Sequence, residues 1–342
     1  MKNNTISLFV PGLWALLRHA GSETLQNMPA LERLLKRCDS STESTLETET
    51  LLLNRLGWSG DEKNDVPVAA LEYLATGGDS GGYRFRADPV NMQEDQNYLM
   101  MSYPSALDDL GLAEAQAMAE SINQHFAEDG WSLEVIDAQR WFLKLDKDPA
   151  IQTTPAWRAV GRDVFGLMPV GENSRQWHAW LMELQMLLYN HPVNEARTEQ
   201  GKAPVSGLWL WGGGELPKLV PTSILLRGDS SLMQGVSRHS DCEMRSLPDD
   251  LLTLCDDVET STKQLIMLEQ ARSALQSGSL EQGKAALQEL EDEVFQPLSA
   301  LLKSRNIGSL IIIDSPGRNV SISAGGLRKW WRRKSLDTKI DA

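Results

Sequence analysis

The alternation of apolar and polar positions predicts a chain that mixes buried strands with amphipathic helices. Short apolar runs at 6–10 and 307–314 are typical of buried strands, and four consecutive apolar residues in the second favour burial on both faces, as in a parallel sheet. Apolar residues recur at helical spacing over 28–37, 112–127 and 174–190, which predicts three amphipathic helices. The chain is therefore expected to have an α/β fold.

Further patterns predict the elements between these. A helix is expected over 50–58, a strand over 250–255, and one long helix over 278–303 that is kinked or ended near Pro297. Residues 76–82, TGGDSGG, form a flexible break and a candidate domain boundary. Segments after the break are expected to be strand, helix, strand and strand, which indicates a small α+β unit inserted into a larger fold.

Composition and charge narrow the classes of function. The 342 residues carry a formal net charge of −14, so a broad acidic surface repels phosphate backbones and nucleic acid is not an expected partner. Three cysteines without C-x-x-C spacing argue against a disulfide framework or a zinc site, and favour reduced thiols in the cytoplasm. No signal-peptide cleavage pattern is present, and no run approaches the ~18 apolar residues of a membrane span.

A glycine triplet follows an apolar strand in the stretch 191–218, HPVNEARTEQGKAPVSGLWLWGGGELPK. Glycines after a strand can cradle a phosphate, but Glu215 would repel one and Pro217 removes an amide donor, so a structural turn is the favoured interpretation. Earlier in the stretch, Pro192 holds His191 extended, and Asn194 is expected to cap a short helix that begins at Glu195.

Two arginines and an aspartate alternate along an expected strand, RFRADP at 84–89. Arg84, Arg86 and Asp88 share one face of that strand. One interpretation is an exposed edge with a local ion pair. The other is a pair of guanidinium groups that grips a carboxylate or phosphate, with Asp88 holding one of them in place.

The C-terminal stretch 327–334, LRKWWRRK, carries five basic residues on an otherwise acidic chain. It could dock an anionic protein partner or cover the acidic body. The favoured interpretation is that Trp330 and Trp331 pack on the core while the arginines stay solvated. Among scattered histidines, HSD at 239–241 comes nearest to a metal-binding pattern, although a polar loop is favoured there too.

Five segments, taken in order, carry a resemblance to a known family. They read MPALERLLKR, LNRLGWSGDEKNDVPVAALEYLATGG, YRFRADPV, HPVNEARTEQGKAPVSGLWLWGGGELPKL and GSLEQGKAALQELEDEVFQPLSALL. Their order, which covers most of the chain, resembles the archaeal-type cofactor-independent phosphoglycerate mutases of the alkaline phosphatase superfamily. The combination of RADPV, HPVN and LWLWGGG resembles more closely a bacterial offshoot, the RpfE-type regulatory proteins. Trp211 stands where the family has an arginine before its glycine triplet.

The resemblance implies two divalent metals and a serine nucleophile, and the matching positions depart from that set. Pro11 stands in place of the first metal aspartate, and Thr48 in place of the nucleophile. The segment 275–282, LQSGSLEQ, has neither His nor Asp where the family has a Gly-His-Asp motif. Asp314 keeps a metal aspartate, but Ser315 follows it in place of a histidine. A two-metal site that lacks most of its ligands is not expected to hold metal.

The resemblance implies a three-layer α/β/α sandwich of alkaline phosphatase type with an inserted smaller α+β domain. Residues 1–80 and 205–342 would form the core, and residues 81–204 the insert. Ligands in such sheets bind at the carboxyl ends of strands, so loops at four places are expected to gather: after Val10, Trp211, Cys255 and Asp314.

The favoured function is a catalytically inactive, phosphoglycerate mutase-like protein with a regulatory or ligand-sensing role and no cofactor. Its ligand would be a phosphorylated small molecule, held by Arg84, Arg86, Asp88, His191, Asn194, Gly212, Gly213 and Gly214. The first alternative is an active phosphoryl-transfer enzyme that uses manganese or magnesium, with Thr48 as nucleophile, Asp314 as a remaining metal ligand, and Glu47 or Glu49 and His239 as helpers. The second alternative is an interaction module whose protein partner meets the basic, tryptophan-containing C-terminal tail.

Overall fold

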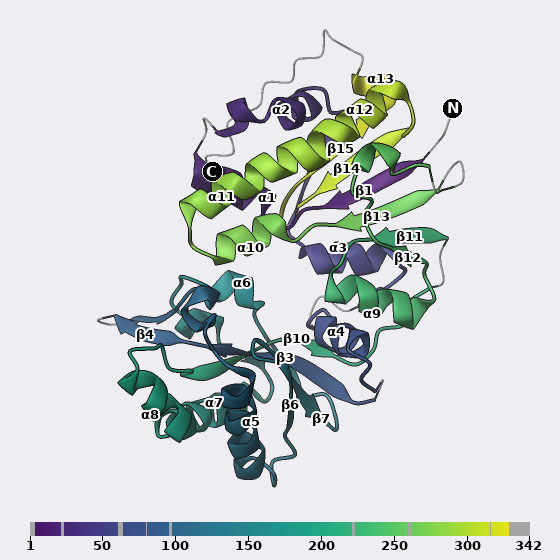
Figure 1. Cartoon of the computed structure of the whole chain (residues 1–342). Coiled ribbons are helices and arrows are strands. Elements are labelled where there is room, and N and C mark those ends of the chain that lie inside the picture. Colours follow the sequence, from purple (N-terminus) through teal and green to yellow (C-terminus); the bar gives the residue numbers. More distant parts are fainter. Residues whose placement is uncertain are drawn as a thin grey trace. The chain divides into compact units, whose positions relative to one another are not determined.

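A computed structural model describes residues 4–21, 24–60, 64–79, 81–95, 98–220, 223–256, 258, 262–314 and 316–327 (Figure 1). The chain divides into two compact units, the first formed by residues 1–58 and 219–342 and the second by 59–218. Each unit has its own sheet and its own hydrophobic core. The second unit is therefore an insertion between two parts of the first.

The sheet of the first unit has seven strands in the order β12-β11-β13-β1-β14-β15-β2. Neighbours from β12 to β14 pair in parallel, whereas β15 pairs antiparallel with both β14 and β2. Leu8 of β1 stands in register with Ile266 and Ile312, and all three are buried, which explains the apolar runs of these strands. The strand bounds are β1 Thr5–Phe9, β2 Ser40–Ser44, β11 Ile224–Arg227, β12 Met244–Arg245, β13 Lys263–Met267, β14 Ser309–Ile313 and β15 Gly317–Ser323.

Most helices of the first unit cover the face of the sheet that carries Ile6 and Leu8 (Figure 1). Their apolar faces meet those strands in one large core cluster. The helices on this face are α1 Leu13–Ala20, α2 Pro29–Lys36, α10 Gln270–Gln276, α11 Leu280–Glu289, α12 Gln296–Ser304 and α13 Ala324–Leu327.

The long helix expected over 278–303 is continuous but irregular. A π-helical turn, Leu290–Phe295, joins α11 to α12 just before Pro297. Proline removes an amide donor and its ring crowds the carbonyl four residues earlier, so a widened turn accommodates it. The same turn holds the buried Glu291, whose two carboxylate oxygens accept hydrogen bonds from the backbone N–H groups of Ala30 and Leu31, at 2.6 and 3.1 Å. Glu291 thereby caps the N-terminus of α2.

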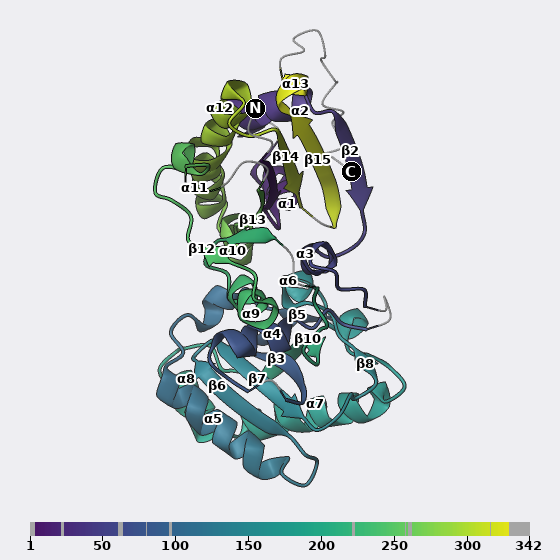
Figure 2. The same ribbon diagram turned by 90° about the vertical axis from the view of Figure 1, so that its right-hand side faces the viewer.

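Two helices lie on the other side of this sheet. Helix α3, Thr48–Arg55, meets β1 through Arg55, whose guanidinium donates to the Ser7 hydroxyl at 3.3 Å and lies 5.8 Å from the centre of the Phe9 ring. Helix α9, Ser231–Ser240, contacts β11 and β12. With helices on both faces, this unit is the expected α/β/α sandwich (Figure 2).

The second unit is built on a four-stranded antiparallel sheet in the order β10-β3-β7-β6. Helices α5 and α7 pack on the face that carries Phe85 and Leu143, whereas α4 packs on the face that carries Phe142. The elements are α4 Val68–Ala75, β3 Tyr83–Val90, β4 Met92–Asp95, β5 Tyr98–Met101, α5 Leu112–His125, β6 Ser132–Asp137, β7 Arg140–Leu145, β8 Ile151–Gln152, α6 Ala156–Ala159, β9 Val170–Gly171, α7 Ser174–Tyr189, α8 Pro192–Glu199 and β10 Gly207–Gly214.

The unit boundaries differ from the expected ones. The resemblance implies boundaries at 80/81 and 204/205, whereas the chain divides at 58/59 and 218/219. Strand β10 belongs to the second unit because it pairs with β3, from Gly207 opposite Val90 to Trp211 opposite Arg86. Helix α4 also belongs there, since it packs on β3 and β10.

One expected strand was wrong. Residues 250–255 form a short 3₁₀ helix, Leu251–Thr253, instead of a strand. Asp250 starts it by accepting a hydrogen bond from the N–H of Leu252 at 2.8 Å. Leu251 and Leu254, three residues apart, are both buried, as a helical turn requires. Within the described ranges, no helix is long and apolar enough to cross a membrane.

Candidate functional site

The carboxyl ends of four parallel strands meet at one edge of the first unit's sheet. Strands β11, β13, β1 and β14 run in the same direction and are neighbours in that order. Binding sites of open α/β sheets lie at this edge. Two of the four loops expected there are brought together, because the segment after Val10 is hydrogen-bonded to Asp314. Trp211 lies inside β10 of the second unit, and Cys255 follows the 3₁₀ helix instead of a strand.

Asp314, the candidate metal ligand after β14, serves as a cap for helix α1. Its two carboxylate oxygens accept hydrogen bonds from the backbone N–H groups of Gly12 and Trp14, at 2.8 and 2.6 Å. The side chain is buried, and this burial raises its pKa to about 6, although the two hydrogen bonds and the charge of Arg272 act in the opposite direction. Gly12 has φ +87°, and a Cβ there would lie 3.2 Å from Cα of Arg272, so the turn requires glycine.

Thr48, the candidate nucleophile, is the first residue of helix α3. Its side chain has no exposed surface, so a phosphate group cannot reach the hydroxyl in this conformation. The hydroxyl of Thr48 is therefore not presented as a nucleophile at an open site.

Glu49 follows Thr48 and forms an ion pair with an arginine from helix α10. Oε1 of Glu49 lies 2.7 Å from Nη1 of Arg272, and the same nitrogen lies 3.5 Å from Oε2 of Glu269. The side chain of Glu49 is 3% exposed and that of Arg272 is 13% exposed. Burial lowers the pKa of Arg272, but the neighbouring carboxylates of Glu49, Glu269 and Glu47 outweigh this effect and hold that pKa above its usual value.

The residues at this edge do not fit a two-metal centre. Such a centre needs several carboxylate and imidazole ligands around each ion. In the part of the chain that the structure describes, no group of three or more His, Cys, Asp or Glu residues could hold a metal ion. One carboxylate oxygen that could serve as a ligand, Oε1 of Glu49, is instead held by Arg272.

Sequence reasoning missed Glu269 and Arg272. The pattern predicts a strand at 250–255, and the resemblance places the metal motif at 275–282, which spans the end of α10 and the start of α11. The strand in this region is β13, and the residues after its carboxyl end lead directly into α10. The apolar run QLIML at 264–268 was the signal that could have located this edge.

In the second unit, Arg84 is held by groups of its own chain. It donates to the backbone oxygen of Gly81 and, at 2.7 Å, to Oδ1 of Asp79. Its guanidinium carbon also lies 4.1 Å from the centre of the Tyr73 ring. These contacts occupy most of the guanidinium group of Arg84, so no ligand is needed to explain its position.

Arg86 lies at the centre of a buried charge cluster. Its guanidinium donates to Glu72 of α4 at 2.5 Å and to Asp88 at 2.6 Å. The indole N–H of Trp211 donates to the other oxygen of Asp88, also at 2.6 Å. Burial disfavours the charged form of Arg86 and so lowers its pKa. The carboxylates of Asp88 and Glu72 outweigh this effect and hold the pKa of Arg86 above its usual value. The expected common face of Arg84, Arg86 and Asp88 is present, but it is covered by α4, and Trp211 of the neighbouring strand β10 lies on the same face.

The glycine triplet encloses an internal carboxylate. The N–H of Gly213 donates to Oδ2 of Asp65 at 3.3 Å, and Thr153 donates to the same carboxylate from its N–H and its hydroxyl. A Cβ on Gly213 would lie 2.7 Å from Cδ1 of Phe85, and one on Gly214 would lie 2.6 Å from Cβ of Pro67. Gly212 has φ +66°. These glycines allow close approach of the chain, as the favoured structural interpretation expects.

His191 and Asn194 connect helices. His191, in an extended conformation, is itself the N-cap of α8, and its Nδ1 accepts from the N–H of Val193 at 3.2 Å. Its Nε2 therefore carries the proton and donates to the Ser121 hydroxyl at 3.0 Å, which is the wrong tautomer to activate that serine. Asn194 is not the cap that was expected. It lies inside α8 and bonds to the backbone oxygens of Leu188 and Val205 and to the N–H of Val205.

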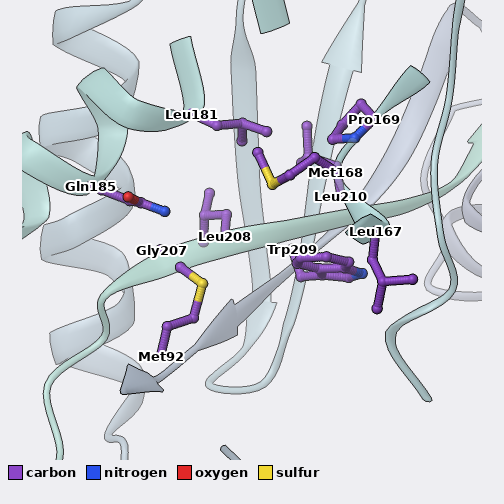
Figure 3. Close-up of a pocket in the computed structure, with 10 residues that line it drawn as sticks. All are labelled: Met92, Leu167, Met168, Pro169, Leu181, Gln185, Gly207, Leu208, Trp209 and Leu210. Carbon is purple, nitrogen blue, oxygen red and sulfur yellow. The ribbon is translucent and has the colours of Figure 1, made fainter. Parts of the chain in front are cut away.

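A small apolar pocket lies beside β10 in the second unit (Figure 3). The side chains of Met92 and Met168 point into it, and Leu181 and Gln185 of α7 line one side. Its free volume of about 20 Å³ is room for about one water molecule. It does not fit a phosphorylated metabolite.

Two predictions concern residues outside the described part of the chain, namely Ser315 and the basic tail after Leu327. His239 lies in the last turn of α9, with Asp241 just beyond the end of the helix. The predicted roles of all candidate ligand-binding residues remain predictions, although the contacts described above account for each of them structurally.

Comparison with known proteins places the chain beside the cofactor-independent phosphoglycerate mutases. It is 26% identical over 141 residues to a probable 2,3-bisphosphoglycerate-independent phosphoglycerate mutase of Geobacter sulfurreducens, a match that covers 41% of this chain and 35% of that protein. It is 24% identical over 185 residues to the 2,3-bisphosphoglycerate-independent phosphoglycerate mutase of Methanosarcina acetivorans, covering 48% of this chain and 46% of that protein. These matches thus span less than half of either relative's length. No protein-family model matches the chain.

Two solved structures superpose on most of the chain. The PH0037 protein from Pyrococcus horikoshii superposes with a TM-score of 0.51 at 12% identity, covering 94% of this chain and 88% of that one. A cofactor-independent phosphoglycerate mutase from Thermoplasma acidophilum gives a TM-score of 0.47 at 15% identity, covering 98% and 94%. The sequence matches bear out the resemblance to phosphoglycerate mutases. The structure of the PH0037 protein bears out the predicted α/β fold. The RpfE-type resemblance remains a prediction.

Proposed function

We propose that this protein is phosphoglycerate mutase-like but transfers no phosphoryl group, and acts by binding in a regulatory or ligand-sensing role. The observation that carries the proposal is the ion pair of Glu49 with Arg272 at the carboxyl edge of the first unit's sheet. A guanidinium that already occupies this carboxylate opposes the binding of a divalent cation beside it, because like charges repel strongly where water is excluded.

The burial of Thr48 supports the same proposal. Phosphoryl transfer depends on placing the nucleophile, the phosphorus and the neutralising cations in line. Thr48 has no exposed surface, and the nearby Asp314 uses both carboxylate oxygens to hold the start of α1. Neither residue is presented for that chemistry.

The regulatory part of the proposal is supported by the resemblance to the RpfE-type regulatory proteins. It is also supported by the ability of such a fold to bind a ligand without catalysing a reaction. The ligand we propose is a phosphorylated small carboxylic acid of the phosphoglycerate kind, bound without manganese or magnesium. A ligand that binds the native state raises the melting temperature by mass action, which makes binding measurable without turnover.

The experiment has two parts. Purified protein is first incubated with 3-phosphoglycerate or p-nitrophenyl phosphate, with MnCl₂ or MgCl₂, alongside a known cofactor-independent mutase. We expect no turnover. Turnover that disappears in Thr48→Ala would falsify the proposal and identify an active enzyme with altered metal use.

The second part tests binding. The melting temperature is measured with 3-phosphoglycerate in EDTA, and with glycerate and inorganic phosphate as separate controls. We expect a rise with 3-phosphoglycerate that exceeds that with either control. Equal melting temperatures in all three would contradict the ligand-sensing role while leaving the question of turnover to the first part.

A further inference from the structure

Helix α7 of the second unit carries two apolar stripes on nearly opposite sides. One stripe packs into the core of that unit and consists of Trp177, Leu181, Leu184 and Leu188. The other contains Met182, Met186 and Tyr189, which are 64%, 70% and 82% exposed. A helix at the surface of a globular protein normally turns polar residues outward, so the second stripe needs its own explanation.

The exposed stripe extends along the whole of α7 with the spacing of a helix–helix contact. Its members are all exposed and are alternately four and three residues apart, namely Arg175, Ala179, Met182, Met186 and Tyr189. This spacing averages about 3.5 residues, the period at which two α-helices keep the same side chains against each other. The exposed stripe therefore has the pattern of a surface that packs against another helix.

The order of the side chains along the exposed stripe is self-complementary. If a second copy of α7 crosses antiparallel at Met182, Arg175 of each copy lies beside Tyr189 of the other, and Ala179 lies beside Met186. A guanidinium group over a tyrosine ring is attractive, and a small alanine leaves room for a long methionine side chain. A parallel arrangement would instead place the two Arg175 side chains side by side, where their charges repel.

A lipid surface fits the exposed stripe less well than a second copy does. Helices that lie on membranes border their apolar face with Lys and Arg, which bind anionic lipids. Here Glu183 borders the stripe, and the chain carries a formal net charge of −14. A second copy needs no further partner, because it brings an aromatic end to meet the basic end.

We propose that α7 is a dimer interface, at which two copies of this chain pack through antiparallel α7 helices centred on Met182. Twofold symmetry is the commonest arrangement of two identical chains, and it uses the same patch on both. One pair of 16-residue helices, each about 24 Å long, is a small interface, so we expect the dimer to dissociate in the micromolar range. This inference is independent of the proposed function.

Sedimentation equilibrium of the full-length protein tests the dimer. We expect the wild type to pass from monomer to dimer between about 1 and 100 μM. Met186→Glu places a charge inside the interface and should weaken association roughly 30-fold or more. Leu280→Glu is the matched control, because it changes another exposed apolar residue, at the start of α11, and should associate like the wild type.

Two results would overturn the inference: a wild type that stays monomeric, or a Met186→Glu protein that dimerises as tightly as the wild type. Because the Met186 side chain is exposed, the variant should keep the melting temperature of the monomer. If Met186→Glu does not fold, Met186→Gln decides, since it removes apolar surface without adding a charge. Its association should also be weaker, and unchanged association would contradict the proposal.

Disulfide crosslinking tests the antiparallel order, with the wild type as control because its three cysteines are buried. Met182→Cys should form an intermolecular disulfide. Tyr189→Cys alone should not, because its two copies would lie about 21 Å apart along the helix axes, but a mixture with Arg175→Cys should. No crosslink through Met182→Cys, or an equally efficient one through Tyr189→Cys alone, would refute the antiparallel interface.

Discussion

The indole N–H of Trp211 donates a hydrogen bond to Asp88 at 2.6 Å, and this carboxylate in turn binds Arg86. The tryptophan stands where the resemblance implies an arginine, so the indole N–H contacts a carboxylate that could otherwise pair with a second guanidinium. The result is a buried cluster in which Arg86 bridges Glu72 and Asp88.

Replacing Arg86 should strongly destabilise the second unit. Arg86→Met leaves Glu72 and Asp88 buried without their cation, for which we expect a loss of about 3–5 kcal/mol in the free energy of unfolding. Urea denaturation followed by tryptophan fluorescence measures it. Arg140→Met is the control, since Arg140 pairs with Asp137 at the surface and should cost less than about 1 kcal/mol. Equal losses in the two variants would contradict the cluster's role.

Adding a methyl group to Gly213 should also destabilise the second unit. The new Cβ would lie 2.7 Å from Cδ1 of Phe85 and 2.7 Å from the hydroxyl oxygen of Tyr83, so we expect a loss of about 1–3 kcal/mol. Gly166→Ala is the control, because nothing lies within 4 Å of its Cβ position. A Gly213→Ala protein as stable as the control would show that the close approach is unimportant.

Asn194→Ala should lower stability by about 2–4 kcal/mol, because three buried hydrogen bonds that join α8 to Leu188 and Val205 are lost together. The matched variant is Asn190→Ala, which removes one exposed hydrogen bond to Met186. It should change stability by less than about 0.5 kcal/mol. Chemical denaturation of both proteins under the same conditions provides the comparison.

Asp314 should make stability depend on pH in a defined window. Burial raises its pKa from 3.8 to about 6, so the folded state favours the protonated form. Its favourable contribution is complete below about pH 4 and is lost as pH rises through about 6, a change of about 3 kcal/mol. In Asp314→Asn this change is absent, so the stability of the wild type relative to the variant should fall between pH 4 and pH 7.

Urea denaturation at several pH values checks this slope. Asp249→Asn, a change at an exposed aspartate, is the control and should keep the wild-type profile. A constant difference between wild type and Asp314→Asn across this range would contradict the assignment to Asp314.

Much of the fold could be predicted, because strong periodic patterns decide local structure. The apolar run at 307–314 and the helical spacing at 112–127 and 174–190 became β14, α5 and α7 with small changes at their ends. Strand β10 was also predicted, but it was assigned to the first unit instead of the second. Pairing with β3 is a long-range choice that the alternation of residues along β10 does not encode.

A residue of the candidate site could be predicted only where its neighbours in the sequence determine its position in the fold. Asp314 was found because it follows a recognisable strand. Arg272 was not, since its partner Glu49 is more than 200 residues away and no spacing rule connects them. Arg86 was recognised as unusual, but whether its guanidinium meets a ligand or Glu72 depends on how α4 packs on β3.

Asp65 has a consequence for how the glycine loop responds to its surroundings. A loop that becomes ordered only when phosphate binds would change its conformation with the phosphate concentration. Here the carboxylate against Gly213 is part of the chain, present at the same effective concentration in every medium. The backbone around the glycine triplet should therefore keep its conformation when the phosphate concentration changes. Any ligand that regulates the protein must bind at another place.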